Sequence, residues 1–119
     1  MYNIHCLNKI SPKGTELLTD SYQTVDSMND ADGVLVRSAA MHDLDLPENL
    51  LAIARAGAGV NNIPLTTCVE EGIVVFNTPG ANARSVMELT LCGMFLASRD
   101  IIGGVNWVQS IKGSSEIGR

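Results

Sequence analysis

Short apolar runs recur along this chain of 119 residues, and helical or turn segments separate each run from the next. Residues 33–36 form a continuous apolar run, and residues 73–76 give the clearest strand signal in the chain. Continuous apolar strands are typical of parallel sheets that are covered on both faces. Alternating strands and helices with short connections also imply right-handed crossovers. The alternation therefore predicts a flavodoxin-like α/β domain, with three layers (α/β/α) and a mostly parallel sheet of five strands.

Cap and breaker residues set the expected boundaries of the elements. Strands are predicted at residues 3–7, 22–25, 33–36, 52–55 and 73–76. Ser11 followed by Pro12 is a helix start signal, and the helix that it opens is predicted to end near residue 18. Further helices are predicted at residues 47–51, 64–72, 85–99 and 101–112, the first of these with Asp45 as its cap.

Composition and charge argue against several classes of partner. The net charge of −5, the pI near 4.8 and the presence of only one Trp, two Tyr and two Phe disfavour a nucleic-acid interface. No apolar run approaches the roughly 18 residues of a membrane span, and the N-terminus lacks the basic start of a signal peptide. Cys6, Cys68 and Cys92 are too scattered for a disulfide framework or a zinc site. We therefore expect a cytoplasmic protein with reduced thiols, no metal, no membrane contact and no nucleic-acid partner.

Three segments follow predicted strands at the edge where parallel sheets bind ligands. They are Arg37 with Ser38, residues 55–59, and residues 77–79. Gly57 and Gly59 can adopt positive φ and turn successive backbone N–H groups toward a small anion. Arg37 could add a charge-assisted hydrogen bond to the same anion. Together the three segments predict a carboxylate site at one edge of the sheet.

Simpler interpretations of these residues remain open. The turn at residues 57–59 could be an ordinary strand-to-helix connection, and Arg37 could be a solvated residue at a strand end. The turn lacks the third glycine and the downstream acidic residue of a dinucleotide fingerprint, so it does not predict a nucleotide site. His5 and His42 have no Cys, Ser or paired carboxylate near them in the sequence. We therefore assign no catalytic residue.

The predicted helix at residues 85–99 is apolar around most of its circumference. A helix of this kind is expected to be buried on several sides, so it should pack against something outside this chain. Ser85 and Glu88 form a capping-box pattern at its start, although Asn82 is a rival cap. Arg84 and Glu88 could instead form an ion pair on the helix surface.

Four segments of the chain carry a resemblance to a known family: Val36-Arg37-Ser38-Ala39, Ala54-Arg55-Ala56-Gly57-Ala58-Gly59-Val60-Asn61-Asn62-Ile63, Glu71-Gly72-Ile73-Val74-Val75-Phe76-Asn77-Thr78-Pro79 and Asn82-Ala83-Arg84-Ser85-Val86-Met87-Glu88-Leu89. In order and spacing they resemble the NAD-dependent D-2-hydroxyacid dehydrogenases, most closely the branch that acts on 3-phosphoglycerate. The resemblance runs from about residue 33 to residue 101 and is weak outside that range. It implies a flavodoxin-like substrate-binding domain at residues 1–99. Residues 100–119 would begin the connection to a Rossmann domain that binds NAD.

The resemblance also implies roles for the residues of the candidate site. Substrate contacts are expected from Arg37, Ser38, Arg55, Ala56, Gly57, Ala58, Gly59 and Asn82. Ala58 would also lie beside the NAD cofactor, and Val86 would pack near the nicotinamide. The family's catalytic arginine, glutamate and histidine lie in or after the cofactor domain. The chain is therefore expected to contain no catalytic residue.

The resemblance implies that the complete enzyme binds a small anionic 2-hydroxy or 2-oxo acid. The expected reaction is oxidation of 3-phosphoglycerate to 3-phosphohydroxypyruvate in serine biosynthesis. The complete enzyme is expected to be a homo-oligomer, and this chain by itself is expected to be inactive. Two alternatives stay open: a dehydrogenase for D-lactate, glycerate or glyoxylate, and a stand-alone anion-binding regulatory module. Ala39 and Ala40 stand where some phosphoglycerate enzymes carry a second arginine. The resemblance therefore supports carboxylate recognition more than phosphate recognition.

Overall fold

The computed structural model describes residues 1–115, which fall into two units. The first unit is Met1–Ala81, and the second begins at Asn82. The expected boundary between a substrate domain and a connection at residue 99 concerns the complete protein and stays a prediction.

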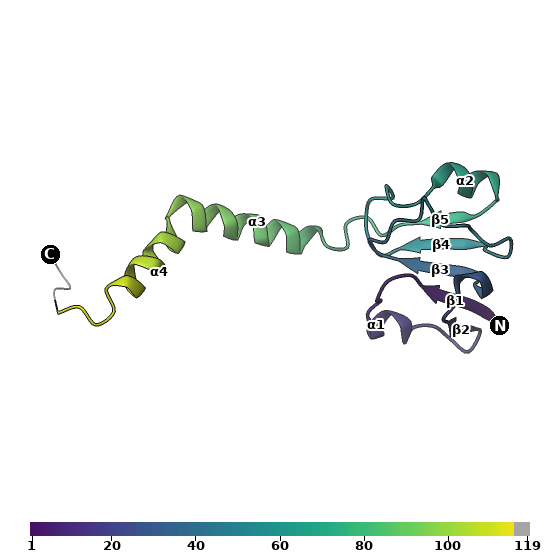
Figure 1. Ribbon diagram of the computed structural model, residues 1–119, viewed down its shortest axis with the longest axis horizontal. Helices are drawn as coiled ribbons and strands as arrows, with labels where there is room; N and C mark the ends of the chain where they lie inside the picture. Colours follow the sequence, from purple (N-terminus) through teal and green to yellow (C-terminus); the bar gives the residue numbers. More distant parts are fainter. Residues whose placement is uncertain (116–119) are drawn as a thin grey trace. The chain divides into compact units, whose positions relative to one another are not determined.

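Five parallel strands form the sheet of the first unit (Figure 1). They are β1 (Tyr2–Cys6), β2 (Tyr22–Val25), β3 (Gly33–Val36), β4 (Ala52–Arg55) and β5 (Val74–Phe76). Their order in the sheet is β2-β1-β3-β4-β5, which is the flavodoxin-like order. The chain moves from β1 to β2 in one direction and then crosses back to β3, so the topological switch point lies between β1 and β3. The predicted fold class is confirmed.

Short helices and turns connect the strands. They are α1 (Pro12–Thr15), the 3-10 helix η1 (Met28–Asp30) and α2 (Leu65–Glu70). Ser11 occupies the N-cap position of α1 with Pro12 directly after it, as predicted. The helix predicted at residues 47–51 is wrong, because this segment makes a single turn closed by the Leu50 amide on the Pro47 carbonyl at 2.9 Å. The next amide, that of Leu51, donates to the Asp32 carbonyl at 2.8 Å, and this bond draws the chain into the sheet.

The core of the first unit lies on one face of the sheet. Val34 and Val36 of β3 and Ile53 of β4 are buried there, together with residues from the connections: Ala31, Met41, Leu50, Ile63, Cys68 and Ile73. Val75 of β5 is in register with Ile53 and packs against this core. Its neighbours Val74 and Phe76 point to the opposite face, as alternation along a strand requires, and are 52 % and 57 % exposed. Within the described chain, β5 is therefore covered on one face.

The second unit consists of two helices, α3 (Ala83–Ser98) and α4 (Ile101–Ser110). Asn82 is at the N-cap position of α3 but makes no side-chain cap bond, and Ser85 lies inside the helix, so the predicted capping box does not form. Arg84 and Glu88 form an exposed ion pair at 3.4 Å. Asp100 caps α4 through a bond from the Gly103 amide at 3.2 Å. A Cβ at position 103 would overlap with that carboxylate.

The apolar side chains of α3 and α4 are not buried within the described chain. Leu89 and Phe95 of α3 are 73 % and 65 % exposed, and Trp107 of α4 is 62 % exposed. What these side chains pack against in the complete protein stays a prediction. Neither helix, nor any other helix of residues 1–115, has the length and hydropathy needed to cross a membrane.

Candidate functional site

The loops that follow β3, β4 and β5 meet at one edge of the sheet. The Arg55 side chain, at the end of β4, donates from Nε to the Arg37 carbonyl at 2.9 Å. From the β5 side, Asn77 Nδ2 donates to the Ala58 carbonyl at 2.7 Å, and the Thr78 amide donates to the Gly57 carbonyl at 3.0 Å. These bonds bring together the three segments that the sequence predicts to converge.

Arg55 holds two of these loops with its guanidinium group. Besides its bond to Arg37, it donates from Nη1 to the Gly59 carbonyl and, at 3.5 Å, to Asn61 Oδ1. The Arg55 carbonyl in turn accepts from Thr78 Oγ1 at 3.3 Å. Nε and Nη1 of Arg55 therefore support the loops, whereas Nη2 has no hydrogen-bond partner among the described residues. The expected substrate contact of Arg55 stays a prediction.

The glycines of the loop at residues 57–59 do not have the backbone conformation expected of them. Positive φ occurs among the described glycines only at residues 72, 80 and 113, so the left-handed conformation considered for Gly57 and Gly59 is wrong. A Cβ at Gly59 would lie 2.9 Å from Arg55 Nη1, and one at Gly57 would lie 3.4 Å from Arg55 Nε. A side chain at residue 59 would therefore have to displace the end of the Arg55 side chain, whereas one at residue 57 would make an ordinary van der Waals contact with it.

The same loop carries backbone donors that could meet an anion. The amides of Gly57, Ala58 and Gly59 donate to no carbonyl or side-chain oxygen among the described residues. Ala58 and Gly59 are exposed and Gly57 is half-buried, so the loop is open to solvent. Ala56 differs, because its amide continues the sheet by donating to the Val36 carbonyl at 2.8 Å. The available donors are thus those of residues 57–59.

Two asparagines to which no sequence pattern gives a role hold the turn at residues 37–39. Asn8 Oδ1 accepts from the amides of Arg37, Ser38 and Ala39 at 2.9, 3.2 and 3.1 Å. Asn62 Nδ2 donates to the carbonyls of Ala39 and Arg37 at 2.8 and 3.4 Å. Asn62 is 8 % exposed, and its Oδ1 is buried without a partner among the described residues. A polar residue placed directly beyond the predicted strand at residues 3–7 was the one available signal for Asn8.

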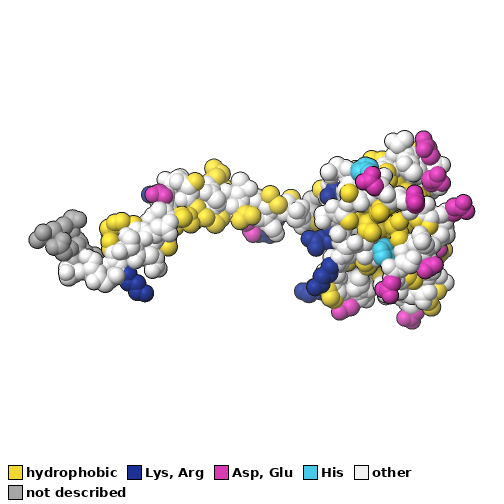
Figure 2. Space-filling model, viewed as in Figure 1, with side chains coloured by type: hydrophobic (Ala, Val, Ile, Leu, Met, Phe, Trp, Pro, Cys, Tyr) yellow, Lys and Arg dark blue, Asp and Glu magenta, His cyan; other side chains and the backbone are white. Residues whose placement is uncertain are grey.

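The charges of the first unit are segregated. Its Lys and Arg residues are Lys9, Lys13, Arg37 and Arg55, and each lies at or after the carboxyl end of β1, β3 or β4. In Figure 2, dark-blue side chains gather at the end of this unit toward which the strand arrows of Figure 1 point, and much of the opposite end is magenta. A local positive field in a chain of net charge −5 favours approach of an anion to this edge.

The other predicted site residues lie as follows. Ser38 is exposed, with its amide bound to Asn8. Asn82 and Val86 belong to the second unit, in which the Val86 amide donates to the Asn82 carbonyl at 3.0 Å in the first turn of α3. Their contacts with a substrate or cofactor stay predictions.

The two histidines are bound to backbone oxygens. His5 Nδ1 lies 3.1 Å from the Val25 carbonyl, and His42 Nε2 lies 2.9 Å from the Asn61 carbonyl. Among residues 1–115, no three His, Cys, Asp or Glu side chains are grouped so that they could hold a metal ion. Burial raises the pKa of the Cys6 and Cys68 thiols, which keeps them protonated at neutral pH.

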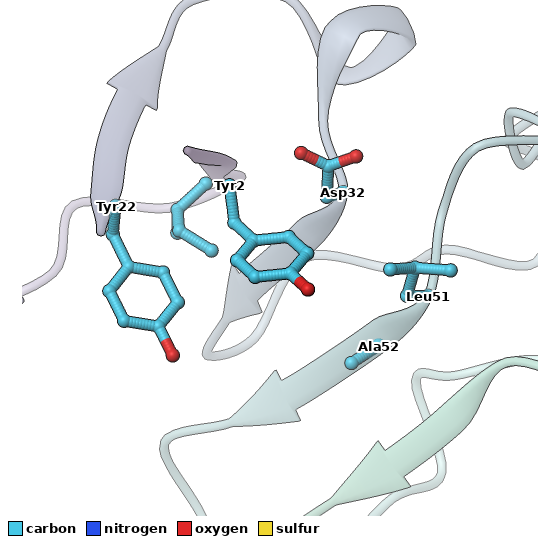
Figure 3. Close-up of a pocket in the computed structure, with 7 residues that line it drawn as sticks. Tyr2, Tyr22, Asp32, Leu51 and Ala52 are labelled. Atoms are coloured by element: carbon cyan, nitrogen blue, oxygen red, sulfur yellow. The ribbon is translucent and has the colours of Figure 1, made fainter.

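A separate cavity of about 200 Å³ lies at the amino-terminal end of the sheet (Figure 3). Its lining is mostly apolar: Tyr2, Ile4, Tyr22, Asp32, Gly33, Leu51 and Ala52. The rings of Tyr2 and Tyr22 lie 6.0 Å apart, and Asp32 Oδ2 accepts from the Asn3 amide at 2.7 Å. The one charged side chain of the lining is an acid, so the cavity does not suit an anion.

Comparisons with known proteins found a matching family model and several similar proteins. A family model described as D-isomer specific 2-hydroxyacid dehydrogenase, catalytic domain, matches residues 4–116. Human D-3-phosphoglycerate dehydrogenase is 39 % identical over 77 residues, which cover 62 % of this chain and 14 % of the human protein. Hydroxypyruvate reductase from Thermotoga maritima is 36 % identical over 115 residues, which cover 84 % of this chain and 38 % of that protein.

A solved structure of NAD+-bound 3-phosphoglycerate dehydrogenase from Entamoeba histolytica is also similar. It superposes with a TM-score of 0.68 at 28 % identity, over 80 % of this chain and 38 % of the Entamoeba chain. The chain thus spans between about one seventh and two fifths of the length of the relatives it matches.

Proposed function

Because this chain belongs to the D-isomer specific 2-hydroxyacid dehydrogenase family, we propose that it is the substrate-binding part of such an enzyme. In the complete enzyme, a hydride would pass from C2 of a 2-hydroxy acid to NAD, which acts as the hydride acceptor when bound. The catalytic groups that take the hydroxyl proton would come from outside this chain. On its own, the chain is expected to have no turnover.

One observation carries this proposal: the amides of residues 57–59, which have no partner among the described residues, lie in a loop that Arg55 ties directly to the Arg37 turn. Backbone N–H groups held in place can bind a carboxylate without reorganisation, and a guanidinium can add a charge-assisted bond. The acid's carboxylate would bind the amides, and Arg37 would bind the same carboxylate or the far end of the substrate. A fixed substrate orientation lowers the entropic cost of the reaction.

The residues proposed to contact the cofactor are compatible with a nicotinamide. Ala58 is exposed at the tip of the loop, and its methyl group offers an apolar contact that leaves the neighbouring amides free. Val86 would add a second apolar contact. Most of the NAD would be bound by a domain outside this chain.

We propose 3-phosphoglycerate as the substrate, which would make the enzyme part of serine biosynthesis. The similarity to human D-3-phosphoglycerate dehydrogenase supports this choice. Lys9 and Lys13 supply positive charge at the same edge as Arg37, where the chain has Ala39 and Ala40 in place of a second arginine. The similarity to a hydroxypyruvate reductase favours, as a second candidate, an enzyme that acts on a small unphosphorylated acid such as glycerate.

Two experiments test the proposal. In the first, the 119-residue chain labelled with ¹⁵N is titrated with 3-phosphoglycerate and with D-glycerate, and amide shifts at residues 57–59 are expected to move. Shifts that move elsewhere, or nowhere, would contradict the proposed site. In the second, the full-length gene product is assayed for NAD reduction with both acids. If Arg37 contacts the phosphate, an Arg37→Met variant should lose more activity with 3-phosphoglycerate than with D-glycerate. If Arg37 contacts the carboxylate, the variant should lose activity equally with both acids.

The complete enzyme is also proposed to be a cytoplasmic homo-oligomer. The exposed apolar side chains of α3 and α4 support association, because surfaces of this kind are usually covered in the working assembly. Light scattering on the full-length gene product would measure its mass, and a monomer at micromolar concentration would contradict this part of the proposal.

A further inference from the structure

The edge of the sheet carries two groups of successive backbone amides, and the two groups differ in whether they have a hydrogen-bond acceptor among the described residues. The amides of residues 57–59 have no partner among the described residues. The amides of Arg37, Ser38 and Ala39 all donate to a single oxygen, Asn8 Oδ1, at 2.9, 3.2 and 3.1 Å. Successive N–H groups that converge on one point form an anion-binding concavity. Here a neutral side chain of the protein itself fills that concavity.

Within residues 1–115, only side chains hold the backbone amides and carbonyls of Arg37 and Ala39. None of the three amides donates to a backbone carbonyl among the described residues. The Arg37 carbonyl accepts from Arg55 Nε at 2.9 Å and from Asn62 Nδ2 at 3.4 Å, and the Ala39 carbonyl accepts from Asn62 at 2.8 Å. The turn therefore depends on two donors, Arg55 of β4 and Asn62 before α2, and on one acceptor, Asn8, which lies just beyond β1.

The sheet topology explains why that acceptor comes from residue 8. β1 lies next to β3, and the ladder between them continues one step beyond β1, because the Leu7 amide donates to the Leu35 carbonyl at 2.9 Å. Asn8 is the next residue along the chain, at the switch point between the two strands. A longer ladder would pair the Arg37 amide with a backbone carbonyl, but the Asn8 side chain takes that place.

We propose that Asn8 is a positioning residue for Arg37. By filling the concavity at residues 37–39, it sets the backbone from which the Arg37 guanidinium reaches the acid. It also closes this concavity to the substrate carboxylate and directs that carboxylate to the amides of residues 57–59. This inference rests on the proposed function of the same edge.

The test compares three substitutions at residue 8 in the full-length gene product. Asn8→Asp keeps an acceptor oxygen at the same place, Asn8→Leu keeps the size without an acceptor, and Asn8→Gly empties the concavity. We expect Asn8→Leu to raise the KM for the acid roughly tenfold or more with little change in kcat, because removing an interaction that stabilises the ground and transition states equally raises KM alone. Asn8→Asp should leave the KM for the acid close to that of the unsubstituted enzyme.

Chemical rescue provides a readout that a merely structural role would not give. In the Asn8→Gly variant the three amides are unpaired, so acetate or formate at millimolar concentration can occupy the concavity. Added acetate is expected to lower the KM of this variant and to leave the KM of the unsubstituted enzyme unchanged or raise it by competition. Lack of rescue would overturn the proposal, even if the Asn8→Leu variant fails to fold.

Asn3→Leu is the matched control, because it makes the same replacement at the other end of β1. Asn3 also bonds through its side chain, with Nδ2 donating to the Asp30 carbonyl at 2.8 Å, but it lies at the amino-terminal edge. It should lower stability without changing KM. An equal rise in KM for Asn3→Leu and Asn8→Leu would overturn the positioning role.

The outcomes separate this inference from the proposed function. If the unsubstituted protein neither turns over nor binds 3-phosphoglycerate or D-glycerate, the proposed function fails, and the role of Asn8 fails with it. If the unsubstituted protein binds and Asn8→Leu binds equally well, only the inference fails.

Discussion

The guanidinium of Arg55 donates to the backbone carbonyl of Arg37 across 2.9 Å. One arginine therefore fixes the backbone of the other, and the two have different tasks although Arg55 ends β4 and Arg37 directly follows β3. Arg55 donates from Nε and Nη1 to the Arg37 and Gly59 carbonyls, whereas Arg37 is exposed and has its own backbone held by Asn8, Arg55 and Asn62. This division predicts that the two arginines respond differently to substitution.

Arg55→Met is expected to lower the free energy of unfolding by about 1–3 kcal/mol, because bonds from a charged donor are removed and two loop carbonyls no longer have that partner. Urea unfolding of the 119-residue chain measures this change. The control is Arg84→Met, which removes only an exposed pair with Glu88 and should change stability by less than about 0.5 kcal/mol. Equal effects of the two substitutions would contradict the supporting role of Arg55.

Gly59→Ala is expected to weaken binding of the acid more than Gly57→Ala does. A Cβ at residue 59 would lie 2.9 Å from Arg55 Nη1 and would force the guanidinium to move, whereas at residue 57 the nearest atom is 3.4 Å away. Neither glycine has positive φ, so backbone strain does not enter the comparison. Amide titrations give the dissociation constant of the acid for each variant. Tighter binding by Gly59→Ala than by Gly57→Ala would show that Arg55 does not hold the loop in its binding conformation.

Affinity for a 2-hydroxy acid should fall as salt rises. Lys9, Lys13, Arg37 and Arg55 lie at the same edge, and solvent-exposed charges are screened over about 10 Å at 0.1 M salt but about 3 Å at 1 M. Titrations of the chain with D-glycerate at low and high sodium chloride measure the effect. The methyl ester of the same acid, which has no charge, serves as the control, and equal salt dependence of acid and ester would rule out electrostatic attraction.

Ile53→Ala should destabilise the first unit by about 2–5 kcal/mol, because it leaves a cavity in the core. Ile53 is fully buried in β4, between β3 and β5. Leu17→Ala is the matched control, since Leu17 is 80 % exposed and its truncation should cost less than about 0.5 kcal/mol. Urea unfolding followed by circular dichroism measures both variants, and similar losses would place the core elsewhere.

The Cys68 thiol should be the last of the three to react with iodoacetamide in the folded chain. It is 1 % exposed, and burial raises its pKa, so both access and the thiolate fraction are low. Cys92 is exposed and should react first. Mass spectrometry of time points gives the order, and early labelling of Cys68 would contradict its place in the core.

The raised pKa of Cys68 also determines whether the free energy of unfolding rises or falls with pH. The folded state binds the thiol proton more tightly than the unfolded state does. The stability that this tighter binding contributes is present at neutral pH and is lost as pH rises through the folded-state pKa. The free energy of unfolding should therefore fall between neutral and alkaline pH. Cys68→Ala should show a smaller fall.

Local patterns in the sequence were sufficient for the architecture. Three predicted strands, at residues 22–25, 33–36 and 52–55, coincide with those of the structure, because short apolar runs between breakers leave the backbone few alternatives. The helix expected at residues 47–51 failed for a non-local reason. The Leu51 amide finds the Asp32 carbonyl, 19 positions earlier in the chain, and pairing across the sheet overrides the local preference for a helix.

The sequence by itself also determined that arginine and glycine residues follow neighbouring strands, since parallel strands end at a common edge. Only the tertiary structure decided what these residues do there. Asn8 meets the amides of residues 37–39 from about 30 positions away, and Arg55 meets the Arg37 carbonyl from 18 positions away. Such bonds depend on β1 lying beside β3 and on β3 lying beside β4. The predicted flavodoxin-like fold implies which strands are neighbours, but no local pattern of residues encodes which side chain will complete which turn.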